Sequence, residues 1–288
     1  MRLPLTALLT CCLAAPTFAA APDCTSEPSS IALDRIDARA IVIGERHGTE
    51  QAPALTGQLV CGLLKRGRST ILALERDSAE QPALDRYLRS PGGPEDVQTL
   101  LANGAWASQL QDGRNSQAML KLIEQMRQWR AAGQRVGVLA MQSEGHDIAP
   151  LSDDEKRPIT GADLDRFSAI NDRSMADKVW MTLALHPGYT VVALAGNVHT
   201  AVASKTRARS LASPSFADVL ASYIPIHVIG LKASDGGSAW NLSSQGSGAH
   251  PVSAGSAFYM NDARVDSLVD LGRVSASAPA AQRQAAAQ

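Results

Sequence analysis

The sequence is poor in several features that would point to a particular partner. Aromatic residues make up only 4% of its 288 residues, and 27 Lys and Arg nearly balance 28 Asp and Glu, for a net charge of −1. Charges of both signs are scattered and no basic stripe is present, which excludes the electrostatic footprint of a nucleic-acid-binding protein. Beyond the N-terminus, no apolar run reaches the roughly 20 residues that a membrane-spanning helix needs. The composition therefore indicates a globular protein, with neither nucleic acid as a partner nor a membrane span in the mature chain.

Cysteine is also scarce, and two of the four cysteines lie in an N-terminal apolar stretch over residues 3–15. A positively charged start, a short apolar stretch and small residues are typical of a secretory signal peptide. We expect cleavage after Ala19, which makes residues 1–19 the signal peptide of an exported protein, periplasmic or secreted. A lipoprotein anchored at Cys11 or Cys12 is the alternative, but both cysteines lie inside the apolar stretch.

Two cysteines remain after cleavage, Cys24 and Cys61. Thiols of exported proteins usually pair in an oxidising compartment. We therefore expect a disulfide between Cys24 and Cys61 that ties an N-terminal extension, residues 20–37, to the first helix. The alternative is one buried thiol and one thiol in a flexible tail.

Five short apolar runs predict the strands of a buried sheet, because none of them alternates apolar with polar residues. The runs are residues 40–43, 70–74, 136–141, 190–195 and 226–231. Helical periodicity lies between them, over residues 52–65, 116–132 and 163–185. Alternation of strands and helices predicts an α/β fold, with a mostly parallel central sheet and helices on both faces. We expect one domain over residues 38–274.

Three segments lack a regular pattern. Residues 90–115 contain Pro and Gly in succession and predict irregular chain near the mouth of the site. Residues 234–256 are rich in Gly and Ser and predict loops or short edge strands. Residues 275–288 are Ala, Ser and Gln for the most part and predict a disordered tail.

Polar residues follow the first, second and fourth runs at the point where each strand should end. The first and fourth runs are followed by Gly44-Glu45-Arg46-His47 and Gly196-Asn197-Val198-His199, and the second by Glu75. Ligands of open α/β sheets bind beyond the carboxyl ends of the strands. We therefore expect His47, Glu75 and His199 to share one small cavity. The alternatives are loop histidines bonded to backbone, and a Glu75 paired with Arg76 or another nearby cation.

Such a grouping suits chemistry at a carbonyl. Histidine acts as base, acid or metal ligand near neutral pH, and carboxylate–histidine groupings mark active sites. Asp172 and Arg173 lie midway in the long predicted helix, where the alternative is an exposed ion pair.

The motifs resemble those of the erythromycin esterase, ChaN and TIKI superfamily. Gly44-Glu45-Arg46-His47-Gly48 is similar to the Gly-Glu-x-His-Gly signature of that superfamily. Its other three motifs resemble Leu72-Ala73-Leu74-Glu75, Asn171-Asp172-Arg173-Ser174-Met175-Ala176 and Leu194-Ala195-Gly196-Asn197-Val198-His199. Order and approximate spacing agree over residues 38–205. One position departs: the arginine of the helical motif would fall at Asn171, with Arg173 as the candidate substitute, so the resemblance leaves open whether Asn171 abolishes activity.

The resemblance implies three functions. Members similar to erythromycin esterase use a histidine base and glutamates to activate water on an ester without requiring a metal. TIKI-like members hold a divalent metal with the paired histidines and a glutamate, and cut peptides. ChaN-like members are exported proteins implicated in haem handling. The signal peptide and the modest size favour the ChaN-like branch, whereas Gly48 favours a hydrolytic one.

We predict an exported hydrolase-like protein that directs water at an ester or amide carbonyl of a small-molecule or peptide substrate. His47 is the general base or a metal ligand, Glu45 and Glu75 orient it or the water, and His199 polarises the carbonyl, binds metal or protonates the leaving group. If a divalent metal is bound, its ligands are His47, Glu75 and His199. The supporting residues are Asp172, Arg173 and Asn197. The alternative is a haem-binding uptake protein of the ChaN type without turnover.

Overall fold

The structure is a computed structural model that describes residues 30–102, 104–108, 111–143, 161–202, 214–243, 246–260 and 263–281, with the backbone alone at 161–164. The predicted signal peptide, Cys24 and residues 282–288 lie outside the described residues. No described helix is long and apolar enough to cross a membrane.

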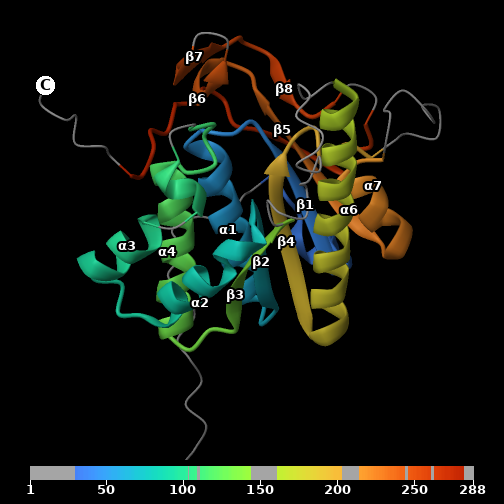
Figure 1. The fold of residues 1–288 in the computed structure, drawn as a ribbon. Helices are drawn as coiled ribbons and strands as arrows, with labels where there is room; N and C mark the ends of the chain where they lie inside the picture. Colours follow the sequence, from blue (N-terminus) through green and yellow to red (C-terminus); the bar gives the residue numbers. More distant parts are fainter. Residues whose placement is uncertain are drawn as a thin grey trace, which may run out of the picture.

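All five predicted strands form and join one sheet (Figure 1). They are β1 (Ala40–Glu45), β2 (Ser69–Asp77), β3 (Val136–Gln142), β4 (Tyr189–Gly196) and β5 (Ile226–Ala233). The sheet order is β3-β2-β4-β1-β5, and every neighbouring pair among these strands is parallel. Two short strands extend the sheet at β5: β8 (Ser256–Phe258), which is antiparallel to it, and β9 (Ser267–Asp270), which is parallel.

The strands are buried on both faces, as their continuous apolar runs predict. In β1, Ile41 and Ile43 belong to one core cluster, whereas Ala40 and Val42 belong to the other. This alternation follows from the pleat, which sends successive side chains to opposite faces.

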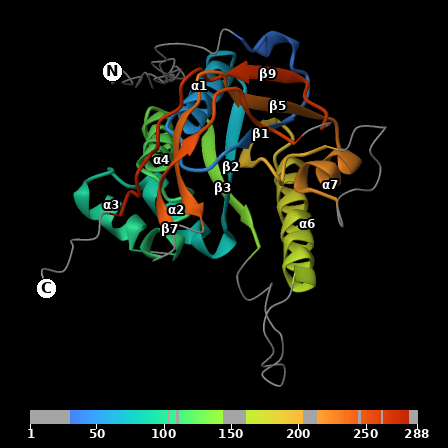
Figure 2. The same cartoon turned by 90° about the horizontal axis from the view of Figure 1, so that it is seen from above.

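Helices cover both faces of the sheet (Figures 1 and 2). One face carries α1 (Gln51–Lys65), α2 (Gln81–Arg89), α3 (Pro94–Leu101) and α4 (Gln117–Ala131), and the other carries α6 (Gly161–Leu185) and α7 (Phe216–Tyr223). The chain steps across the sheet in one direction from β1 to β3 and then returns through β4 to β5. Because parallel crossovers are right-handed, that reversal moves the connecting helices to the opposite face. The predicted fold class, a single α/β domain with helices on both faces, is confirmed.

Residues 90–115 are more regular than predicted. They contain α3 and a 3-10 helix, η3 (Gly104–Ala107). Pro94 opens α3 at a position where its missing N–H costs nothing, and the Asp96 carboxylate accepts hydrogen bonds from the Gly92 and Gly93 N–H groups, both at 2.9 Å. The Gly- and Ser-rich residues that follow β5, for which composition predicts loops or short edge strands, form the antiparallel strands β6 (Gly237–Ser243) and β7 (Gly246–Val252), which make a two-stranded sheet of their own.

Residues 275–281 are ordered, whereas composition predicts a tail that begins at 275. Their backbone bonds to two loops, with isolated β-bridges from Thr49 to Ala276 and from Ser116 to Pro279. Ser277 is almost fully buried. Backbone hydrogen bonds do not depend on side-chain composition, which is why an Ala- and Ser-rich segment can take this place. The domain therefore extends beyond residue 274.

The position of β4 brings the predicted site residues together. Because β4 lies between β1 and β2, Gly196 stands in register with Glu45, and Leu194 with Leu74. The pairing of β2 with β3 shifts register between Leu74 and Asp77, which is a β-bulge. Bulges re-aim side chains at the end of a strand, and here Glu75 and Arg76 lie in that stretch.

Candidate active site

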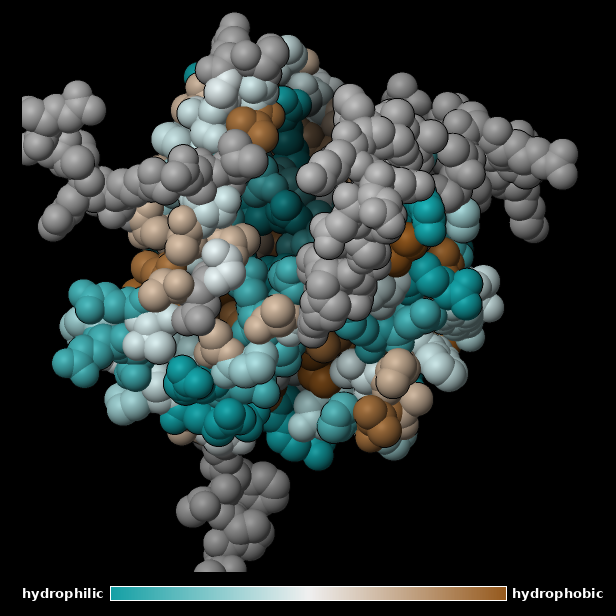
Figure 3. Space-filling model, in the orientation of Figure 1, coloured by the Kyte–Doolittle hydropathy of each residue, from teal (hydrophilic) through white to brown (hydrophobic). Residues whose placement is uncertain are grey.

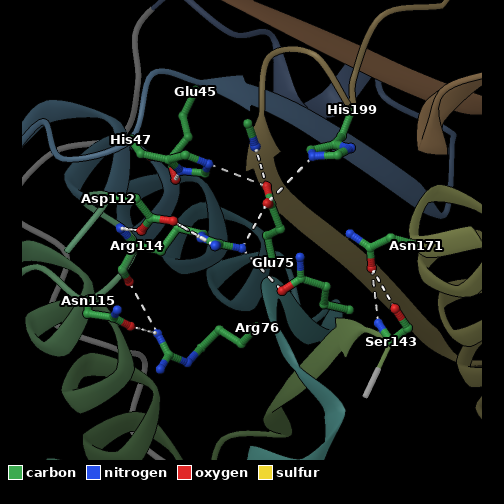
Figure 4. A network of polar contacts seen from close by, with 12 residues as sticks. Glu45, His47, Glu75, Arg76, Asp112, Arg114, Asn115, Ser143, Asn171 and His199 are labelled. Atoms are coloured by element: carbon green, nitrogen blue, oxygen red, sulfur yellow. Dashed lines mark hydrogen bonds and ion pairs between the residues drawn. The ribbon is translucent and has the colours of Figure 1, made fainter. Parts of the chain in front are cut away.

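Glu75 lies between the two histidines at the carboxyl edge of the sheet (Figure 4). His47 Nε2 is 3.5 Å from Glu75 Oε2, and His199 Nε2 is 3.6 Å from Glu75 Oε1. The structure therefore places together the three residues that were expected to share one site. Among the described residues, neither ring bonds to a backbone group as the alternative interpretation required.

A second carboxylate holds the far nitrogen of each ring. His47 Nδ1 is 3.0 Å from Glu45 Oε1, and His199 Nδ1 is 2.6 Å from Asp172 Oδ1. These contacts orient each imidazole so that its Nε2 faces Glu75. We call this arrangement the carboxylate–histidine chain. Its members, in order, are Glu45, His47, Glu75, His199 and Asp172.

The turn after β4 packs closely against the carboxylate–histidine chain. The Asn197 N–H donates to the Glu45 carbonyl and the His199 N–H to the Gly196 carbonyl, both at 2.9 Å. A Cβ on Gly196 would lie 2.9 Å from His47 Nε2, closer than real Cβ atoms approach other heavy atoms. Glycine is therefore needed at position 196 for His47 to approach Glu75.

Glu75 is buried and both of its oxygens have further partners. The Gly196 N–H donates to Oε2 at 2.7 Å, and Arg114 Nη1 donates to Oε1 at 3.2 Å. A buried carboxylate is costly unless it is paired and hydrogen-bonded, and these donors meet that condition. Of the cations considered as alternative partners, Arg76 bonds to Glu80 and lies over the Trp106 ring, whereas another nearby cation, Arg114, does pair with Glu75.

Sequence reasoning missed Arg114. This residue precedes α4, and its guanidinium bonds to Asp112 Oδ2 through Nε at 2.8 Å and to Gln142 Oε1 through Nη1 at 3.1 Å. The Arg114 carbonyl accepts a hydrogen bond from Arg76 Nη1 at 3.2 Å. Arg114 follows no strand and belongs to no motif, so only the expectation that residues 90–115 lie near the site mouth pointed to this part of the chain.

The charges of the carboxylate–histidine chain stabilise one another. Burial lowers the pKa of His47, but the Glu75 and Glu45 carboxylates outweigh burial and raise it to about 9. Burial likewise lowers the pKa of His199, but Asp172 and Glu75 outweigh it and the net shift is upward. The pKa of Glu75 moves the other way: burial raises it, and His47, His199 and Arg114 bring it below its ordinary value. Near neutral pH His47 is therefore cationic and Glu75 is anionic, and the shift at His199 favours its cationic form.

One of the expected supporting residues lies elsewhere. Arg173 is exposed on α6, bonds to Asp177 at 3.3 Å and lies over the Tyr223 ring, so it does not supply a guanidinium to the site. Asn171, at the position where the similar motif has an arginine, accepts hydrogen bonds from the Ser143 N–H and hydroxyl at 3.0 and 3.1 Å (Figure 4). Asn197 contributes its backbone N–H, as described above.

The residues suggested as metal ligands do not fit that role. Among the described residues, no group of three or more His, Cys, Asp or Glu side chains is arranged to hold a metal ion. The Glu75 oxygens are already bonded to the Gly196 N–H and to Arg114, a permanent cation. We therefore derive no chemical step through a metal.

Space for a ligand lies beside Glu75. A cavity of about 400 Å³ is lined by Glu75, Arg114 and Gln142 on one side. Its remaining lining residues are Arg76, Asp77, Ala79, Glu80, Gly104, Ala105 and Asn115. In Figure 3 the molecule is hollowed below the β6–β7 hairpin, and hydrophilic residues line the hollow. Polar ligands suit such surroundings.

Comparison with known proteins gives a likeness of fold. No family model matches the sequence, and no curated protein matches it. A protein of Bacillus cereus has a similar structure, with a TM-score of 0.63 and 14% identity over 91% of this chain and 96% of that chain. The erythromycin esterase EreC, in an open conformation, has a TM-score of 0.52 and 11% identity over 75% of this chain and 76% of that chain. ChaN of Campylobacter jejuni, in a structure with cofacial haem, has a TM-score of 0.42 and 15% identity over 69% of this chain and 83% of that chain, and we draw nothing from that likeness.

Proposed function

We propose that this protein is a hydrolase in which His47 directs water at an ester or amide carbonyl while His199 supplies a proton. One observation carries the proposal: two imidazoles with fixed Nδ1 atoms turn their Nε2 atoms toward the same carboxylate at 3.5 and 3.6 Å. Those separations exceed usual hydrogen-bond lengths, so each Nε2 remains able to bond to an oxygen atom of water or substrate. The fold shared with an erythromycin esterase supports an ester before a peptide.

His47 acts in its neutral form. Its Nε2 takes a proton from water as the water oxygen bonds to the carbonyl carbon, and Nδ1–H remains bonded to Glu45. The resulting imidazolium lies between two carboxylates, which stabilise it. Arg114 and the Gly196 N–H hold Glu75 ionised, so that Glu75 does not take the proton in place of His47.

His199 acts in its protonated form, which Asp172 stabilises through Nδ1. Its Nε2–H bonds first to the carbonyl oxygen as negative charge develops there, and then protonates the leaving alcohol or amine as the carbonyl carbon–heteroatom bond breaks. After product release His47 gives its proton to solvent and His199 takes one up, so that both histidines regain their starting states while Glu75 stays ionised. One water is consumed, and an acid and an alcohol or amine are released.

We also propose export to the periplasm or the medium, on the anatomy of residues 1–19. That location places the reaction on compounds that meet the cell from outside.

The test is hydrolysis of a panel of model esters and peptides by the intact protein, with and without chelator. We expect His47→Gln to lower kcat by about 10²–10⁴, the usual worth of a general base. His186→Gln is the matched control, because His186 is exposed at the end of α6, and we expect it to retain full activity. Chelator should leave the rate unchanged.

Three outcomes would contradict the proposal. Equal rates for His47→Gln and the control would remove His47 from the reaction. Loss of activity on chelation would overturn the metal-free mechanism. A haem titration that gives a saturable Soret shift, with no hydrolysis across the panel, would establish the haem-binding alternative instead.

A further inference from the structure

Two loops distant in the sequence deliver side chains to Glu75. The loop after β1 carries His47, which approaches Oε2, and the loop before α4 carries Arg114, which bonds to Oε1. The positions of His47 and Arg114 around Glu75 therefore depend on how these two loops are held relative to each other. Residues 275–281, the strap, bond to both.

The first anchor of the strap is next to His47. The Ser277 N–H donates to the Gly48 carbonyl at 2.8 Å, and Gly48 directly follows His47. The Glu50 N–H donates to the Ser275 carbonyl at 2.9 Å and completes a β-bridge. This anchor fixes the backbone on the carboxyl side of His47.

The second anchor is next to Arg114. The Ala280 N–H donates to the Asn115 carbonyl at 2.8 Å, and Asn115 directly follows Arg114. The Gln117 N–H donates to the Ala278 carbonyl, also at 2.8 Å, at the start of α4. In Figure 1 the strap is the red stretch beside the upper ends of α1 and α4.

A single residue of the strap, Ser277, bonds to both loops through its N–H and its hydroxyl. Its N–H bonds to Gly48, and its buried hydroxyl oxygen accepts a hydrogen bond from the Ala118 N–H at 2.9 Å. Ala118 lies in the first turn of α4, where N–H groups have no partner within the helix. The Ser277 hydroxyl therefore satisfies a donor of the α4 terminus and holds that terminus beside the loop of His47.

We propose that the strap positions the residues that contact Glu75. In this proposal Ser277 is a positioning residue, which sets the distance between His47 and Arg114 on either side of Glu75. Both anchors fall on the residue directly after a residue that contacts Glu75. A strap with only a structural role could be anchored anywhere along the two loops. The kinetic part of this inference rests on the proposed hydrolase function.

The kinetic test compares Ser277→Ala with Ser277→Thr, which keeps the hydroxyl. We expect Ser277→Ala to lower kcat by ~10-fold with KM within about twofold, since displacement of a reacting group by about 1 Å can cost 10²-fold, and we expect Ser277→Thr to recover most of the rate. Ser90→Ala is the matched control, because Ser90 also bonds through its hydroxyl to backbone, at the far end of α2. A chain that ends at Val274 should lose more activity, whereas one that ends at Ala281 should match the full chain.

A spectroscopic test requires no turnover. We expect the imidazole resonances of His47 to move in Ser277→Ala, and those of His199 to stay, because the described contacts of the strap do not include the turn after β4. A general loss of stability would instead shift the resonances of both histidines or of neither. If Ser277→Ala matched Ser90→Ala in kcat and in the His47 resonances, the strap would be structural only and the inference would be wrong. If the intact protein hydrolysed nothing, the proposed function would fail and the resonances alone would decide the inference.

Discussion

At the scale of single residues, the site is a row of charges of alternating sign. Each imidazole lies between two carboxylates, and Glu75 lies between the two imidazoles, with Arg114 as a permanent cation beside it. Because every member has partners of opposite sign, the buried charges are stable without a bound ion. The same arrangement makes the protonation of His47 a link between stability and rate.

The pH dependence of stability follows from the pKa of His47. This pKa is about 9 in the folded protein against 6.5 for an unperturbed histidine. The stabilisation is fully present below pH 6.5 and is lost as pH rises through about 9. We expect the free energy of unfolding to fall by roughly 3 kcal/mol over that interval, at about 1.4 kcal/mol per pKa unit. Denaturant titrations from pH 6 to pH 9.5 measure the fall, and His47→Gln should flatten it.

The same titration acts on the rate with the opposite sign. Neutral His47 is the base, so kcat/KM of the free enzyme should rise with pH toward about 9. A kcat/KM that instead falls over this interval would make His47 the acid and exchange the roles of the two histidines. Wild-type and His47→Gln unfolding curves that run parallel would show that the histidine is not held between carboxylates.

At the scale of elements, three backbones meet beside the site. Gly113 has φ of 98°, and a Cβ there would lie 2.4 Å from the Trp240 carbonyl oxygen and 2.5 Å from the Gly48 nitrogen. The Gly48 carbonyl also accepts a hydrogen bond from the Trp240 N–H at 2.9 Å. The hairpin strand β6 and the loops of His47 and Arg114 are thus packed too closely for any side chain at position 113.

We expect Gly113→Ala to lower both stability and activity. The backbone conformation alone costs about 1–3 kcal/mol for a residue with a side chain, and displacement of the neighbouring loop adds to it. Gly67→Ala is the matched control, because Gly67 also has a positive φ, 72°, but nothing lies within 4 Å of its Cβ position. Unfolding midpoints and kcat of the two variants separate conformational strain from contact. Equal losses would show that the close approach at Gly113 is unimportant.

The elements of the sheet could be predicted from sequence because burial on both faces gives unbroken apolar runs, such as Val191 to Ala195 in β4. The histidines could be predicted because each follows a strand end through a glycine. Arg114 could not, since it reaches Glu75 from a loop and only the three-dimensional path of that loop brings it there. The strap could not either, because its bonds are almost all made by backbone atoms. Arg173 was wrongly expected to support the site because it adjoins Asp172 in the sequence, whereas of the two only Asp172 faces the site.

At the scale of the whole molecule, one covalent link is predicted between the N-terminal extension and the sheet domain. Cys61 is buried in α1, and Cys24 lies outside the described residues, so the disulfide remains a prediction. Thiol counting on denatured, unreduced mature protein should find no free thiol, and the reduced sample should give two. In the chain-entropy model the link is worth about 4 kcal/mol, so reduction should lower the unfolding midpoint. Two free thiols before reduction would contradict the pairing.

The position of β4 has a consequence for synthesis. This strand lies between β1 and β2, yet it follows both in the chain by more than a hundred residues, as the pairing of Ile41 and Ile71 with β4 shows. While the nascent chain is growing, the facing edges of β1 and β2 have no partner, and parallel pairings of such long separation form slowly. Open apolar edges of this kind expose a chain to aggregation. The partly folded chain in which β4 has not yet paired is therefore the form of this protein most prone to aggregate, whether it arises during synthesis or after the proposed export.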